Sequence, residues 1–276
     1  MVKNIRIITN LFFVLLLITL GVMNRFVLDD GNDEWYENTY SKIRIITSEV
    51  RGGLTYIGVE VLLDDNTYTY WSNPGDSGIE PSIMIKNQYI NDYSINWPTP
   101  KLLKDEFGTN YIYEDAVLIP ITISLENYKY GDDIVLDMNF GICNLVCIPI
   151  NQTIVFQLDE KQRNDNKIRY KLIHNALKNI PKYRSDDIKF IKNIKFNDLT
   201  SNDNLQITFG KKIDAIFPLT SEEYFLSDNQ SQQENYLNYN FKFRSYVGDF
   251  ESKDIKMTFL IKTEGQHFLE DFIINP

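Results

Sequence analysis

The chain has 276 residues, of which 43% are hydrophobic, 13% aromatic and 24% charged. This composition is typical of a globular protein and excludes a disordered chain, a collagen and a polytopic membrane protein. The net charge of −10 opposes the phosphate neutralisation on which nucleic-acid binding depends, so we expect no nucleic-acid partner. Two Cys cannot supply the four soft ligands of an all-cysteine zinc site, and two His with no dense ligand cluster do not favour a His-rich catalytic site, so we expect no metal and no cofactor.

The N-terminus has the pattern of an export signal. Lys3 and Arg6 precede an apolar run from Leu11 to Met23. This length is typical of a signal peptide, since a membrane-spanning helix needs about 20 apolar residues. We predict that residues 1–23 are a signal peptide; because Gly21 is the only small residue near the end of the run, an uncleaved N-terminal anchor is the alternative. Both interpretations place residues 30–276 outside the cytoplasm, in a compartment where disulfides persist.

The next part of the chain alternates between apolar and polar residues, as β-strands do. Residues 41–63 form two such runs around Arg51-Gly52-Gly53 and predict a hairpin. Short runs separated by Pro, Gly, Asn and Asp predict further strands at Ser82–Ile85, Ala116–Ser124, Asp133–Phe140 and Thr153–Leu158. Many short strands at this spacing indicate a β-sandwich.

One helical pattern follows. Apolar residues recur at helical spacing between Asn166 and Asn179, and Pro181 ends the pattern. Beyond it we predict strands at Asp187–Phe196, Leu205–Phe209, Asp214–Leu219, Tyr239–Tyr246 and Ile255–Lys262, and a polar loop at Asp228–Asn235. The sequence therefore predicts an all-β fold, with a sandwich domain at residues 30–160, a linker helix at 161–182 and a second, smaller β-rich domain at 183–276.

Cys143 and Cys147 are the strongest candidates for chemistry. Three residues lie between them and they follow a predicted strand, so a turn would bring their Cα atoms within the roughly 4.4 to 6.8 Å that a disulfide needs. Crosslinking so few residues removes little chain entropy, which favours a redox role over a stabilising one. A structural disulfide that only stabilises the turn is equally compatible with the spacing.

A second motif resembles a catalytic segment but is better explained as a turn. Gly75-Asp76-Ser77-Gly78 looks like the nucleophile segment of a trypsin-like serine protease. His174 and His267 both follow Ser77, whereas that fold places its base before the nucleophile. We therefore interpret the segment as a turn.

Several segments, taken in chain order, resemble the N-terminal domain of the DsbD family of thiol:disulfide interchange proteins. They are Gly58-Val59-Glu60, Tyr70–Gly78 (Tyr-Trp-x-x-Pro-Gly-Asp-x-Gly), Trp97–Pro100, Asp105–Gly108, Tyr113–Pro120 and the two cysteines before Pro149. The resemblance covers residues 41–158, and the later part of the chain is only loosely similar.

The resemblance implies an immunoglobulin-like β-sandwich and a component of a protein-disulfide reductase. Cys143 and Cys147 would receive electrons from a membrane-embedded thiol reductase, acting in trans, and pass them to periplasmic thioredoxin-fold proteins. Phe107 would cap the pair, with Asp105 and Glu106 beside it raising the thiol pKa or accepting its proton.

Two departures from the family pattern predict weaker shielding of the cysteines. The pair is separated by three residues where the best-known DsbD has five, and the cap loop is one residue shorter and lacks a second aromatic. Which cysteine attacks first stays open. The alternative function is an exported, non-catalytic β-sandwich binding module with a structural turn disulfide.

Overall fold

The computed structural model describes residues 34–48, 50, 52–90, 92–106, 108–158, 167–184, 189–196, 204–219, 221, 224–228, 237–245 and 254–274. The chain divides into two compact units, Met1–Trp35 and Tyr36–Pro276, and the fold below is that of the second unit. The predicted signal at residues 1–23 lies outside the described residues. Among those residues, no helix is long and apolar enough to cross a membrane.

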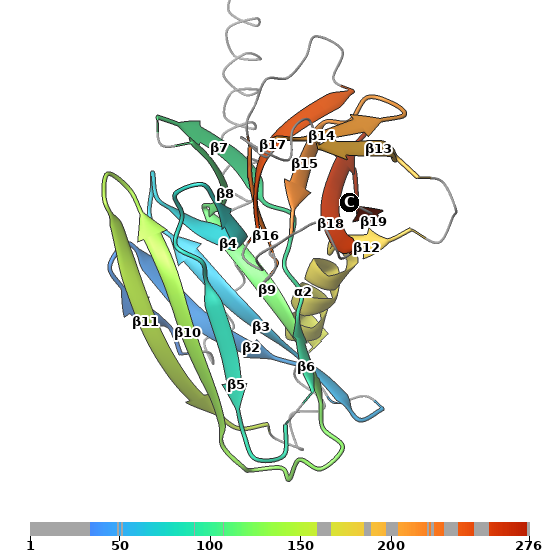
Figure 1. The fold of residues 1–276 in the computed structure, drawn as a ribbon. Coiled ribbons are helices and arrows are strands. Elements are labelled where there is room, and N and C mark those ends of the chain that lie inside the picture. The colour runs from blue at the N-terminus through green and yellow to red at the C-terminus, as the bar shows by residue number, and fades with distance from the viewer. Residues whose placement is uncertain are drawn as a thin grey trace, which may run out of the picture. The chain divides into compact units, whose positions relative to one another are not determined.

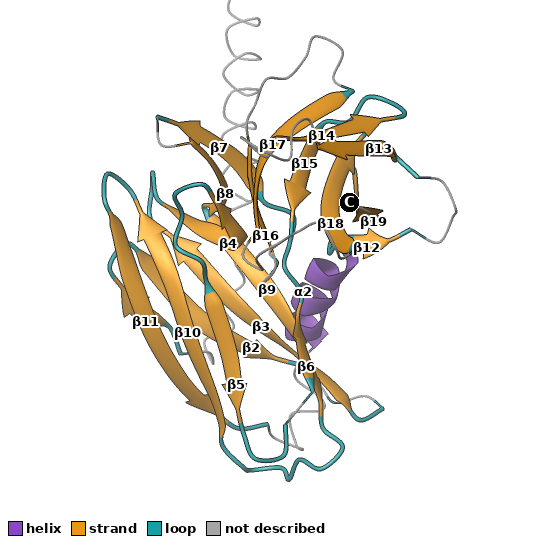
Figure 2. Cartoon of the chain, viewed as in Figure 1, coloured by secondary structure: helices purple, strands orange, loops and turns teal. Residues whose placement is uncertain are grey.

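The first half of this unit is built from two β-sheets (Figures 1 and 2). Its strands are β1 (Tyr36–Asn38), β2 (Ser41–Thr47), β3 (Leu54–Leu63), β4 (Tyr68–Gly75), β5 (Ser82–Lys86), β6 (Tyr93–Ile95), β7 (Lys101–Asp105), β8 (Gly108–Glu114), β9 (Ala116–Ser124), β10 (Ile134–Cys143) and β11 (Cys147–Phe156). The first sheet has the order β1-β2-β3-β9-β6. The second has the order β11-β10-β4-β8-β7, and β5 also pairs with β10.

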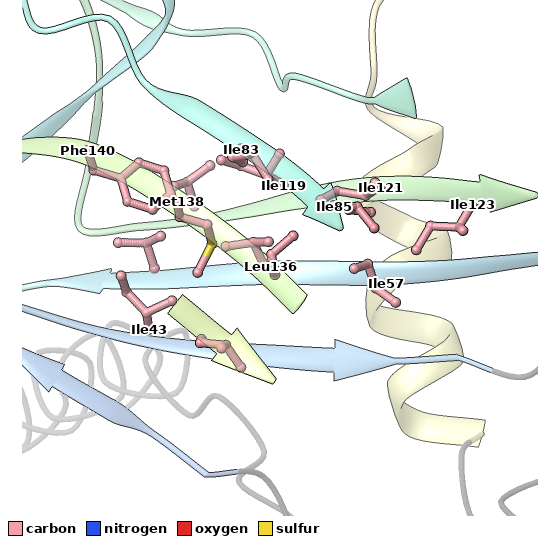
Figure 3. Close-up of a cluster of buried hydrophobic side chains, with 14 of the residues drawn as sticks. Ile43, Ile57, Ile83, Ile85, Ile119, Ile121, Ile123, Leu136, Met138 and Phe140 are labelled. Carbon is pink, nitrogen blue, oxygen red and sulfur yellow. The ribbon is translucent and has the colours of Figure 1, made fainter. Parts of the chain in front are cut away.

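Alternation along the strands builds the core between these two sheets. Every second residue of β10 from Ile134 to Ile142 is at most 2% exposed. Side chains of the first sheet, such as Ile57 and Ile119, pack in the same cluster with Leu136 and Met138 of the second (Figure 3). Successive side chains of a strand point to opposite faces, so the other face of each sheet is left for other contacts.

The single described helix, α2 (Lys167–Lys178), covers the outer face of the first sheet. It contacts β2, β3 and β9. Its buried Ile173 lies over Gly58, where an added Cβ would come within 3.4 Å of the Ile173 side chain. The predicted helix is thus present, and it ends before Pro181 because proline disfavours helical backbone at the residue before it.

The second half is a smaller pair of four-stranded sheets, ordered β12-β19-β18-β15 and β13-β14-β17-β16. The strands are β12 (Lys182–Tyr183), β13 (Ile191–Phe196), β14 (Asn204–Phe209), β15 (Ala215–Pro218), β16 (Tyr224–Asp228), β17 (Asn238–Ser245), β18 (Ile255–Thr263) and β19 (Gln266–Ile274). A separate cluster of buried Phe, Ile and Leu side chains fills the space between them. The prediction of an all-β fold with one helix and a second β-rich part is confirmed.

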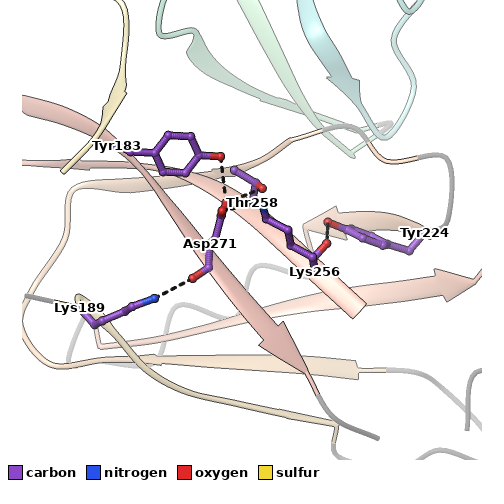
Figure 4. Close-up of polar contacts among 6 residues, drawn as sticks. All are labelled: Tyr183, Lys189, Tyr224, Lys256, Thr258 and Asp271. Carbon is purple, nitrogen blue, oxygen red and sulfur yellow. Dashed lines mark hydrogen bonds and ion pairs between the residues drawn. The ribbon is translucent and has the colours of Figure 1, made fainter. Parts of the chain in front are cut away.

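Asp271 ties the strands of one of these sheets together (Figure 4). Its Oδ1 accepts hydrogen bonds from the Tyr183 hydroxyl at 3.0 Å and from the Thr258 hydroxyl at 2.8 Å. Its Oδ2 pairs with the Lys256 ammonium at 2.7 Å. Burial raises the pKa of Asp271, but these three donors outweigh it and leave the pKa below the ordinary value of 3.8.

The two halves share part of one core. Phe217 of β15 is 2% exposed and packs edge-on against Trp71 of β4 and Tyr111 of β8, with ring centroids 6.1 and 5.4 Å apart. The buried Asn73 side chain donates to the backbone oxygen of Pro218 at 2.8 Å. These contacts attach strand β4 of the first half to strand β15 of the second half.

Candidate functional site: a hairpin disulfide under a tyrosine

The cysteines close the end of the β10–β11 hairpin. Cys143 is the last residue of β10 and Cys147 the first of β11, and the two are paired directly across the strands. Their Sγ atoms form a disulfide, with the Cα atoms 4.0 Å apart. The hairpin tip is Asn144-Leu145-Val146. The turn predicted at this position brings the sulfurs together, with a Cα separation slightly shorter than the expected range.

The two cysteines differ sharply in exposure. Cys143 is 0% exposed, whereas Cys147 is exposed on β11, the edge strand of the second sheet. An incoming thiolate must approach a disulfide sulfur directly, so access decides which sulfur it attacks. In this hairpin Cys147 is the more exposed of the two cysteines, so we expect attack at its sulfur.

A tyrosine lies over the disulfide. The Tyr70 hydroxyl is 3.3 Å from the sulfur of Cys147 and 3.3 Å from that of Cys143. Neither sulfur of a disulfide carries a hydrogen, so the hydroxyl is the donor. Tyr70 packs in a small cluster with Ile112 and Cys143, beside Tyr68 and Leu103, on the outer face of the sheet.

Two glycines make room for this ring. An added Cβ at Gly78 would lie 2.7 Å from the Tyr70 ring, and one at Gly141 would lie 3.2 Å from it. The added Cβ would also lie 2.4 Å from Pro74 at Gly78 and 2.9 Å from Ile79 at Gly141, so a larger side chain requires the ring and these neighbours to shift. The position of the Tyr70 hydroxyl over the sulfurs thus depends on Gly78, the last residue of the Tyr-Trp-x-x-Pro-Gly-Asp-x-Gly segment.

The surroundings of Tyr70 keep its hydroxyl protonated. Burial raises the pKa of Tyr70 most, and the charge and hydrogen bond of Tyr68 and the charge of Asp105 raise it further. The hydroxyl therefore remains a hydrogen-bond donor throughout the physiological pH range.

The Pro-Gly-Asp segment attaches the β7–β8 hairpin to β4. The Asp76 carboxylate accepts a hydrogen bond from the Thr109 backbone N–H at 2.8 Å, and the Asp76 N–H donates to the Thr109 oxygen at 2.9 Å. Gly75 has a φ of +88°, and a Cβ there would lie 2.2 Å from that same oxygen, so only glycine fits. Ser77 hydrogen-bonds with the Asn110 side chain, which fits the structural interpretation of this motif.

The acidic segment lies in a hairpin and not in a loop. Asp105 pairs with Gly108 at the end of β7 and β8, and Glu106 lies in the turn after Asp105.

The structure describes two of the three predicted cap residues. Asp105 lies near enough to Tyr70 for its charge to act on that hydroxyl, and Glu106 is exposed in the turn. Phe107 lies outside the described residues. Among the described side chains, no group of three or more His, Cys, Asp and Glu is arranged to hold a metal ion.

Comparisons with known proteins agree with this site. Residues 43–159 match the family model described as thiol:disulfide interchange protein DsbD, N-terminal. This matched segment contains both cysteines, Tyr70 and the β7–β8 hairpin. Residues 43–159 are therefore similar to a DsbD N-terminal domain. The sequence motifs indicated the same similarity to a thiol–disulfide interchange family.

The solved structures extend the likeness beyond this domain. The N-terminal periplasmic domain of ScsB from Proteus mirabilis matches with a TM-score of 0.67 and 18% identity, over 87% of this chain and 97% of that chain. At this identity the match shows a common fold, which includes most of the second half.

Two further matches carry no argument about the fold. The GAE domain of yeast GGA1 gives a TM-score of 0.29 at 6% identity, over 45% of this chain and 98% of that chain. The GAE domain of GGA2p from Saccharomyces cerevisiae gives 0.27 at 12% identity, over 46% and 96%. No curated protein matches the chain.

Proposed function

We propose that this DsbD-like domain exchanges electrons through its Cys143–Cys147 pair. The observation that carries the proposal is the asymmetry of the disulfide: Cys147 is exposed on an edge strand, Cys143 is buried, and the Tyr70 hydroxyl lies 3.3 Å from both sulfurs. A disulfide that only holds a turn needs neither feature. The similarity of residues 43–159 to a thiol–disulfide interchange family supports the same chemistry.

The exchange begins at Cys147. A thiolate of a reduced partner attacks the Cys147 sulfur, the bond between the two cysteines breaks, and Cys143 leaves with the electron pair as a thiolate. The second thiol of the partner, deprotonated, then attacks the partner's own sulfur in the mixed disulfide and releases Cys147 as a thiolate. Two electrons have moved to the domain, and the partner's dithiol has become a disulfide.

The reduced pair reverses these steps with an oxidised acceptor. Cys147 attacks the acceptor disulfide, and Cys143 resolves the mixed disulfide. The Tyr70 hydroxyl donates a hydrogen bond to the sulfur of Cys143 whenever that sulfur carries charge, and so stabilises the leaving thiolate.

The partners belong to two classes. We propose that a membrane-embedded thiol reductase supplies the electrons in trans and that thioredoxin-fold proteins receive them. We place the exchange in the periplasm, with residues 1–23 as the export signal or anchor; the match to a periplasmic domain of ScsB supports this location. Phe107, Asp105 and Glu106 would shield the pair and adjust its reactivity from the β7–β8 turn.

Two variants test the order of attack. In a Cys143→Ser variant the reduced Cys147 has no resolving partner, so mixing with an oxidised thioredoxin-fold protein should trap a covalent adduct visible on a non-reducing gel. A Cys147→Ser variant leaves only the buried Cys143 sulfur and should give no adduct. If neither variant forms an adduct and the wild-type protein does not exchange with the thioredoxin-fold protein, the disulfide has only a structural role and the domain is a binding module.

A further inference from the structure

The hairpin tip between the cysteines carries two exposed apolar side chains. Leu145 is 97% exposed and Val146 is 71% exposed, more than any other large hydrophobic residue in the described part of the chain. Isolated apolar residues on a surface are ordinary. Two adjacent ones at the end of a hairpin are unusual, because such turns favour Gly, Asn, Asp and other polar residues.

The tip lies where a partner must approach. Val146 directly precedes Cys147, the exposed cysteine of the pair. In a mixed disulfide the partner's sulfur is joined to the Cys147 sulfur at about 2 Å. Any protein partner bonded there covers the neighbouring side chains, whereas a small thiol need not.

The edge of the sheet disfavours recognition through the backbone. Strand β11 is an edge strand, and Pro149, two residues beyond Cys147, has no N–H to offer to an added strand. Proline on an edge is one of the features that block strand pairing. Next to the exposed sulfur, binding therefore depends on side chains.

We propose that Leu145 and Val146 are the docking element for the protein partner of the exchange. They insert into an apolar depression beside the reactive cysteine of a thioredoxin-fold protein. The inference rests on the proposed exchange at Cys147. It assigns partner selection to the tip itself, and it makes the tip a specificity element that small thiols do not use.

The test compares a protein partner with a small thiol. A Leu145→Ser/Val146→Ser double variant and the wild-type protein, both oxidised, react with reduced thioredoxin and, separately, with dithiothreitol in stopped-flow measurements. The double variant should react with thioredoxin at least tenfold more slowly and with dithiothreitol within twofold of wild type. A Leu145→Met/Val146→Ile variant, which keeps the apolar tip, should restore the thioredoxin rate.

A matched control lies on the same strand. Val155 of β11 is 53% exposed but eight residues from Cys147, so Val155→Ser should leave both rates unchanged. Equal thioredoxin rates for the wild type and the double variant would overturn the docking role, and so would a parallel loss of both rates. Failure of the wild-type protein to react with either reductant would instead overturn the proposed exchange.

Discussion

Tyr70 is the residue that distinguishes this disulfide from a bare hairpin crosslink. Its hydroxyl lies 3.3 Å from both sulfurs, and Gly78 and Gly141 leave space for its ring. The sequence reveals the cysteines through their spacing but not this contact, because Tyr70 and Cys143 are 73 positions apart. The alternation Tyr68-Thr69-Tyr70 was the only local sign that two tyrosines share a face.

Removing the hydroxyl should slow the exchange. Tyr70→Phe keeps the ring but deletes the donor to the leaving sulfur, and a hydrogen bond to a charged group is worth about 1.5 kcal/mol or more. We expect the rate of reduction by dithiothreitol to fall about tenfold, with little change in thermal unfolding.

Tyr130→Phe is the control, because Tyr130 is an exposed tyrosine. It should leave the exchange rate unchanged. An unaltered rate in Tyr70→Phe as well would show that the hydroxyl only packs over the disulfide.

Among the elements, alternating apolar strands were predicted well and polar hairpins poorly. The β2–β3 hairpin and strand β9 lie where the sequence placed them, because their inward positions are almost all Ile and Val. Strand β11 begins at Cys147 and not at Thr153, since Pro149 and the polar residues after it were interpreted as a turn. On an edge strand these residues face solvent and need not interrupt the pairing.

The charge of Asp271 makes the stability of the folded protein depend on pH. The pKa of Asp271 is lowered in the folded state, so its stabilising effect is present above its unfolded pKa near 3.8 and is lost as the pH falls through the lower folded value. Asp271→Asn should lower the stability at pH 7 by roughly 1 kcal/mol, or about 2–4 °C in Tm. The difference from wild type should shrink below about pH 4 in thermal melts.

The exposed Asp254 provides the comparison for this variant. Asp254→Asn should leave the melting curve unchanged at both pH values. A stability loss in Asp271→Asn that persists unchanged at pH 3 would mean that packing, and not the charge, is responsible.

For the whole molecule, the contact of Phe217 with Trp71 and Tyr111 joins the second half to the strands of the redox site. Trp71 follows Tyr70 in β4 and points to the other face of the sheet, so β4 lies between the disulfide and the second half. The division of the chain at residues 160 and 183 stays a prediction. The shared core indicates that the two halves unfold together.

Phe217→Ala tests this coupling. Removing a buried Phe costs about 3–5 kcal/mol. We expect the single unfolding transition of the wild type to split in calorimetry, with an early change in tryptophan fluorescence. A single transition at the wild-type Tm would contradict the coupling.

The central claim is that the Cys143–Cys147 disulfide exchanges electrons. Its small closed loop is worth only about 2 kcal/mol in the chain-entropy description, so the domain should stay folded when the disulfide is reduced. The most direct measurement is its reduction potential in glutathione buffers, combined with its rate of exchange with a thioredoxin-fold protein. The account predicts a potential above about −300 mV and rapid exchange. A potential below that value, with no exchange, would contradict it.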